Sequence, residues 1–162
     1  MKRALAVLLA TVIVVLGTRA IVRSLASDET KIRWTLEALV EGYNEGDVGD
    51  TVRPIAGDWR HEGYGFDRDD VRGKLIAEFF QDRDPKTKQL TRRVALDDDT
   101  IEIEVAGELA TLTFDAGFER VKDDLWTEVW RARIEADLER GDSGWLIHRT
   151  RHTDLLNTPL SR

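Results

Sequence analysis

The fold is decided by residues 100–152, which read TIEIEVAGELATLTFDAGFERVKDDLWTEVWRARIEADLERGDSGWLIHRTRH. Apolar and polar side chains alternate along most of this stretch, as at Ile101, Ile103 and Val105, which glutamates separate. Gly, Asp, Lys and Ser cluster where the alternation is interrupted. Period-two alternation bounded by turn residues is typical of antiparallel hairpins. The stretch therefore predicts consecutive antiparallel strands with one apolar face, which another part of the chain must cover.

Two amphipathic helices upstream are predicted to provide that cover. Residues 28–44 repeat apolar side chains at helical spacing. Residues 67–81 do the same, with Asp67 as the N-cap and Asp70 in a capping-box position. Helices packed on one face of an antiparallel sheet define an α+β fold.

Three shorter elements are expected between the helices and the sheet. They are a short helix over residues 48–55, an irregular aromatic strand over 58–66, and a strand over 89–96 that turns at Asp97-Asp98-Asp99. The three aspartates could attract Ca²⁺, but they lack the spaced ligands and the glycine of a calcium loop. A solvated turn is the favoured interpretation.

The first 26 residues differ in composition from the rest. Lys2 and Arg3 precede an apolar run from Ala4 to Gly17, which is the pattern of a signal peptide. Continued to Val22, the same run would make a helix of about 28 Å, close to the thickness of a bilayer core. We expect a signal peptide or a membrane anchor over residues 1–26, and favour the anchor. The domain is then at the cell membrane outside the cytoplasm, or secreted or periplasmic after cleavage.

The remainder of the chain is acidic and contains no cysteine. Four of the 24 Lys and Arg residues lie in the first 23 positions, which leaves 20 basic against 31 acidic residues, a net charge of −11. This charge argues against a nucleic-acid partner, which requires a basic surface. The absence of Cys excludes disulfides, thiolate metal sites and a Cys nucleophile. One domain is expected over residues 27–153, followed by a C-terminal tail over 154–162.

The order of these elements, together with three short signatures, resembles the nuclear transport factor two-like superfamily. Its members include SnoaL-like proteins, ketosteroid isomerase and scytalone dehydratase. The signatures are EGYNEGD at 41–47, Leu109-Ala110 at the start of a strand, and GWLI at 144–147. The resemblance covers about residues 28–153. It implies a cystatin-like cone, in which a strongly curved sheet wraps over helices and leaves a pocket at its open end, and homodimers joined through the outer face of the sheet.

The steroid-isomerase pattern of this superfamily does not carry over. Counted from Asp47, its tyrosine, its base and its oxyanion-hole acid fall at Leu39, at Gly63 and near Ile134. None of these side chains exchanges a proton, so steroid isomerisation is not expected, although Glu62 lies beside the base position.

Six residues are candidates for the expected pocket, namely Tyr43, Trp59, His61, Tyr64, Glu128 and Trp130. His61 is attractive as a general base because histidine titrates near neutrality. The aromatic candidates can line a pocket or simply pack in the core. No set of catalytic residues is assigned.

Glu128 shares its parity with Trp126 and Trp130, so a regular strand would point all three at the apolar face. A carboxylate there requires a partner, such as His61 or Tyr43, or a raised pKa. A bulge near Trp126 would instead return Glu128 to water.

No metal or cofactor is expected. His148 and His152 resemble a metal pair, but on a regular strand they share a face about 13 Å apart, too far to hold one ion. No phosphate loop, nucleophile elbow or zinc-protease helix occurs in the sequence.

Two functions are compatible with these features. The favoured one is a membrane-tethered SnoaL-like domain that binds a small hydrophobic ligand or a protein partner without catalysis. The alternative is a pocket enzyme doing general acid–base chemistry of isomerase, dehydratase or hydrolase type on a small hydrophobic molecule. An open apolar pocket with two of His61, Tyr43 and Glu128 in hydrogen-bond reach would favour the enzyme.

Overall fold

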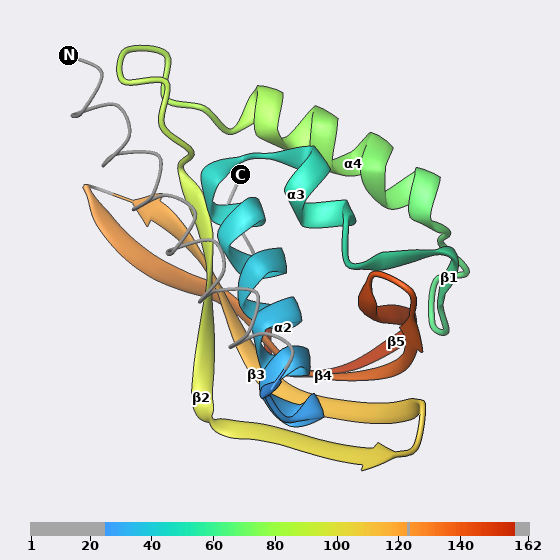
Figure 1. Cartoon of the computed structure of the whole chain (residues 1–162). Coiled ribbons are helices and arrows are strands. Elements are labelled where there is room, and N and C mark those ends of the chain that lie inside the picture. The colour runs from blue at the N-terminus through green and yellow to red at the C-terminus, as the bar shows by residue number, and fades with distance from the viewer. Residues whose placement is uncertain (1–24, 123, 158–162) are drawn as a thin grey trace, which may run out of the picture.

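A computed structural model describes residues 25–122 and 124–157, and in it the strands curve around one long helix, α2 (Figure 1). The elements in chain order are α2 (Asp28–Glu45), α3 (Val48–Val52), β1 (Ile55–His61), α4 (Arg68–Gln81), β2 (Arg92–Ala106), β3 (Leu109–Lys122), β4 (Leu125–Gly141) and β5 (Gly144–Asn157). This arrangement confirms the α+β fold class and the curved sheet. Residues 1–24, which make up most of the expected signal or anchor, lie outside the described range. Within that range, no helix is long and apolar enough to cross a bilayer.

The sheet has the strand order β1-β5-β4-β3-β2. Strands β2 to β5 form the antiparallel meander predicted from the alternation. Strand β1 pairs in parallel with β5, which joins the start of the domain to its end. Strand β5 continues to Asn157, beyond the boundary expected at residue 153.

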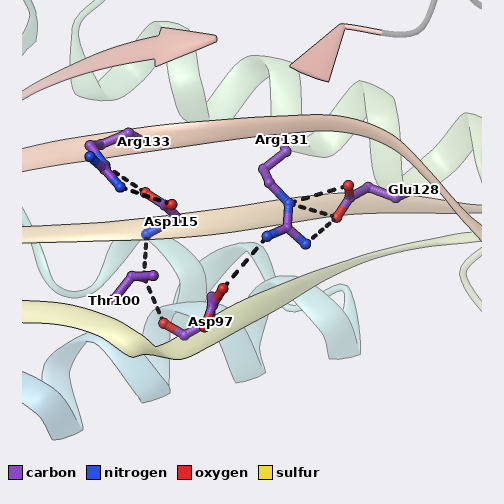
Figure 2. Close-up of polar contacts among 6 residues, drawn as sticks. All are labelled: Asp97, Thr100, Asp115, Glu128, Arg131 and Arg133. Carbon is purple, nitrogen blue, oxygen red and sulfur yellow. Dashed lines mark hydrogen bonds and ion pairs between the residues drawn. The ribbon is translucent and has the colours of Figure 1, made fainter. Parts of the chain in front are cut away.

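Strand β2 passes straight through the turn expected at Asp97-Asp98-Asp99, so that expectation is wrong. The pairing with β3 shifts between Asp97 and Glu102, which marks a bulge inside one bent strand (Figure 1). The Thr100 hydroxyl bridges the gap, since it donates to the Asp97 carbonyl (2.7 Å) and accepts the Asp115 N–H (2.9 Å) (Figure 2). The Thr100 side chain thus takes the place of the backbone hydrogen bonds that the bulge interrupts.

The core lies between α2 and the concave face of the sheet. Ile32 and Leu36 of α2 are buried against Leu112 of β3 and Leu138 of β4. Asn44, near the end of α2, binds the backbone of Val94 on β2 with both ends of its amide, at 2.9 and 2.7 Å. This pair of hydrogen bonds fixes the end of α2 to the edge strand.

Helix α4 starts with the predicted capping box. The Asp67 side chain accepts the Asp70 N–H, and the Asp70 carboxylate accepts the Asp67 N–H, at 2.9 and 3.1 Å. The two aspartates satisfy N–H groups that the first turn of a helix leaves free.

Gly42 marks the closest approach between α2 and α3, and its replacement should be costly. A Cβ at this position would lie 2.7 Å from the Thr51 nitrogen and 2.9 Å from the Asp50 carbonyl carbon, both in backbone that cannot rotate away. We expect Gly42→Ala to lower the free energy of unfolding by about 1–2 kcal/mol, because overpacking outweighs the gain in helix propensity. Chemical denaturation measures this change.

Gly73 in α4 is the matched control, because a Cβ there meets nothing within 4 Å. Gly73→Ala should therefore raise the free energy of unfolding by up to about 1 kcal/mol. Equal effects of the two substitutions would contradict the close contact of α2 with α3.

Candidate functional site

A cavity of about 260 Å³ lies between α2 and the concave face of the sheet. Most of its wall is apolar, with Leu36 from α2, Phe118 from β3 and Ile134 from β4 among the lining residues. Two alanines on the inner face, Ala116 and Ala136, leave the space open beneath the helix. The cavity is thus a product of small side chains at the centre of a curved sheet.

Two histidines meet at the rim of this cavity. Nε2 of His61 lies 3.0 Å from Nδ1 of His152. His61 ends β1 and His152 lies on β5, and the parallel pairing of these strands places His61 opposite Thr150. The contact therefore depends on residues 91 positions apart in the chain.

The surrounding hydrogen bonds determine where the protons of this pair lie. Nδ1 of His61 accepts the N–H groups of Gly63 (3.0 Å) and Tyr64 (3.2 Å), so this nitrogen carries no proton. The proton of neutral His61 is then on Nε2 and is donated to Nδ1 of His152. His152 in turn carries its proton on Nε2, which lies 3.6 Å from Oδ1 of Asp154.

The chain of contacts ends at Asp154, whose Oδ1 accepts the indole N–H of Trp130 at 2.8 Å. Trp130 lines the cavity, and its ring packs edge-on against His152 at 5.4 Å. Both lone-pair nitrogens of the histidine pair already accept an N–H. The pair as arranged is thus better suited to hydrogen bonding than to removing a proton from a ligand.

His61 should make the stability of the protein depend on pH. Burial, and then the neighbouring His152, lower the pKa of His61. The unfolded chain therefore binds this proton more readily, and the free energy of unfolding should fall as the pH drops below the ordinary histidine pKa of about 6.5. We expect the fall between about pH 7.5 and pH 5.5 to be smaller in His61→Gln, measured by urea denaturation at both values. An equal fall of the free energy of unfolding in wild type and His61→Gln would contradict the lowered pKa of His61.

The six candidate residues are distributed over different parts of the fold. His61, Trp130 and Tyr43 line the cavity. The Tyr43 ring packs against Phe79 at 5.4 Å, and burial raises the pKa of its hydroxyl, which lies next to Arg92. Trp59 is buried in the core and does not line the cavity. Tyr64 is 62% exposed and stacks on His61 at the rim.

Glu128 lies on the outer face of the sheet, so of the two alternatives the bulge is confirmed and the inward position on a regular strand is wrong. Trp130 pairs with Phe118 but Glu128 pairs with Glu119, which leaves Val129 as a bulge that reverses the alternation. The Glu128 carboxylate binds Arg131 at 2.9 Å instead of His61 or Tyr43, as Figure 2 shows. His61, Tyr43 and Glu128 therefore do not converge.

A second bulge separates His148 from His152, which were expected to share a face. Arg149 pairs with Asp137 and Ile147 with Leu138, so His148 is the extra residue. Its Nδ1 lies 2.9 Å from Asp58, away from the cavity. Residues 150, 152 and 154 consequently face inward. A run of polar residues at every second position near the end of the last strand is the signal that could have indicated Thr150, His152 and Asp154.

A wider groove of about 640 Å³ runs between α2, α3 and the turn between β4 and β5. Charged and polar side chains such as Lys31, Glu41 and Asp50 contribute to its wall, and it is more open than the cavity. The cavity is therefore the more apolar site and the better one for an apolar molecule.

No family model and no curated protein matches the sequence. Solved structures do match. An NTF2-like protein with a cystatin-like fold from Novosphingobium aromaticivorans aligns over 89% of this chain and 90% of its own, with a TM-score of 0.66 and 15% identity. The chain has the NTF2-like fold. Another protein of that organism, named provisionally as an aromatic ring hydroxylase, covers 80% of this chain and 90% of its own (TM-score 0.61, 14% identity).

A third protein with the NTF2-like fold, from Streptomyces avermitilis, is named provisionally as a dehydratase of the NTF2-like family. It covers 80% of this chain and 97% of its own, with a TM-score of 0.61 and 14% identity. The resemblance inferred from EGYNEGD and GWLI is thus confirmed at the level of the fold. One NTF2-like fold carries different activities, so function must be argued from the cavity itself.

Proposed function

We propose that this chain binds a small, mostly apolar molecule in the cavity between α2 and the sheet, without catalysis. The observation that carries the proposal is an almost wholly apolar wall, with the contacting pair His61 and His152 among the few polar residues that line it. Ligand pockets have typical volumes of roughly 300–1,000 Å³. The cavity, at about 260 Å³, is just below this range and suits a molecule of about one ring.

The histidine pair supports binding in preference to catalysis. A general base needs a free lone pair within reach of the substrate. Nδ1 of His61 and Nδ1 of His152 both accept hydrogen bonds from within the protein. Of the groups expected to serve an enzyme, His61 and Tyr43 line the cavity but Glu128 is on the outer face.

General acid–base chemistry on a small hydrophobic molecule is the second candidate. It is favoured by the ordered contacts from His61 through His152 to Asp154, because enzymes often orient a catalytic histidine through a carboxylate. It requires a ligand that displaces His61 from Nδ1 of His152. Turnover of a bound molecule, lost in His152→Gln, would establish this candidate.

The domain is further proposed to be tethered to a membrane, outside the cytoplasm, through residues 1–26. The support is the basic start and apolar run of that segment. Full-length protein should sediment with membranes, or lose about 26 residues by processing. Unprocessed protein in the soluble cytoplasmic fraction would contradict the tether.

A homodimer through the outer face of the sheet is proposed on the resemblance alone. In this chain that face carries ion pairs such as Arg133 with Asp115 at 2.8 Å (Figure 2). The interface would therefore be polar, and its formation should weaken with salt.

Titration with cumene, a single-ring hydrocarbon, tests the proposed function. Saturable binding of one molecule per full-length chain, followed by tryptophan fluorescence because Trp130 lines the cavity, is the expected result. A linear, non-saturating response would contradict it.

A further inference from the structure

The polar atoms along the cavity limit the chemical class of molecule that can bind there. This inference rests on the proposed function. Most of these atoms are already engaged. The Arg151 guanidinium binds Glu135 at 2.7 Å and lies 3.8 Å from Glu62. The Tyr43 hydroxyl lies next to Arg92. Both nitrogens of His61 are used by Gly63, Tyr64 and His152.

The Nε2–H of His152 is different. Its nearest acceptor is Oδ1 of Asp154 at 3.6 Å, beyond the 2.7–3.2 Å of an ordinary N–H···O hydrogen bond. Asp154 already accepts the shorter bond from Trp130. His152 lines the cavity, and among the described residues its Nε2–H makes no hydrogen bond.

The charge near this donor limits what it can bind. The Asp154 carboxylate, 3.6 Å from Nε2, disfavours a second negative charge at the same place. The nearby cation, Arg151, is already paired with Glu135. An uncharged oxygen acceptor therefore fits the rim better than a carboxylate or a phosphate.

We propose that the ligand is a neutral molecule with an apolar body of about one ring and one carbonyl-type oxygen, which accepts the Nε2–H of His152. His61 is a positioning residue. Both of its nitrogens are engaged within the protein, so it gives the ligand no hydrogen bond but holds the ring of His152 with the proton on Nε2. Thr150, two positions away on the same strand face, also lines the cavity.

Three probes of similar size test this class. Acetophenone has the carbonyl oxygen, cumene replaces the carbonyl with an apolar group, and benzoate adds a negative charge. In full-length wild type we expect acetophenone and cumene to bind and benzoate to bind at least about tenfold more weakly than acetophenone. His152→Phe should lower the affinity for acetophenone roughly fivefold to tenfold, because the hydrogen bond to its oxygen is lost. The affinity for cumene should change less than about twofold.

His148→Phe is the matched control, because His148 faces away from the cavity toward Asp58. It should leave the affinity for all three probes unchanged. An independent readout is ¹⁵N NMR of the histidine rings, which should show His61 and His152 both protonated on Nε2. His61→Phe should remove the preference of His152 for this tautomer.

The inference and the proposed function fail on different results. If His152→Phe lowers the affinities for acetophenone and cumene equally, or if benzoate binds most tightly, the inference is overturned while the proposed function stands. A His152 ring protonated on Nδ1 in the wild type also overturns it. If neither acetophenone nor cumene binds saturably, the proposed function fails together with the inference.

Discussion

Leu36→Ala should lower the free energy of unfolding by about 3 kcal/mol. Leu36 is 1% exposed and connects α2 to the centre of the sheet. Truncating it removes buried apolar surface and leaves space that the stiff strands cannot close. The same change widens the cavity, which Leu36 lines, so the variant should accept larger rings than the wild type. Denaturation by guanidinium measures the first effect and probe titration the second.

Ile76→Ala provides the control for this truncation. Ile76 lies on the solvent side of α4 and is 53% exposed. Its replacement should change the free energy of unfolding by no more than about 0.5 kcal/mol. If Leu36→Ala lowered the free energy of unfolding as little as Ile76→Ala does, the packing of α2 on the sheet would be contradicted.

Filling the cavity should abolish cumene binding. Ala116 is 1% exposed and lies on the inner face of β3, where it lines the cavity. Ala116→Phe places a ring in the space that the ligand is proposed to occupy, and we expect affinity to fall at least about 100-fold, with some loss of stability from overpacking. Far-ultraviolet circular dichroism and a cooperative unfolding transition verify that the variant is folded.

The same substitution in the wider groove is the control. Ala38 lines that groove on the other side of α2, so Ala38→Phe should leave cumene binding unchanged. Binding lost in Ala38→Phe and kept in a folded Ala116→Phe would place the ligand in the groove and refute the proposed site.

Local sequence signals predicted most of the elements. The capping box at Asp67 and Asp70 and the alternation in residues 100–152 depend only on neighbouring residues, and both are confirmed. The parallel pairing of β1 with β5 was not predicted. Ile55 and Ile147 lie far apart in the chain, and no local pattern specifies that they pair.

The errors at the candidate site have one physical origin. A bulge adds one residue and reverses the face of every residue beyond it. The bulge at Val129 moves Glu128 outward, and the one at His148 moves His152 inward. Neither residue type marks a bulge, so regular alternation placed Glu128 on the apolar face and placed His148 and His152 on one face, and both placements fail. Asp154 was assigned to a tail because the end of β5 carries few apolar residues.

His61 and Trp130 were located by residue type and do lie at the cavity. Their partners could not be found in the same way. The contact of His61 with His152 depends on β1 pairing with β5, and the contact of Trp130 with Asp154 depends on the register of β4 with β5, which the bulge at His148 shifts. The chemistry of the rim is thus set by strand register more than by local sequence.

Contacts between bound cumene and methyl groups of the protein, measured as intermolecular NMR Overhauser effects, test the central claim most directly. The account predicts signals to methyl groups that line the cavity, on Leu36, Ile134 and Ala136. Signals to Thr35, Ala38 and Leu146, which line the wider groove, would contradict it.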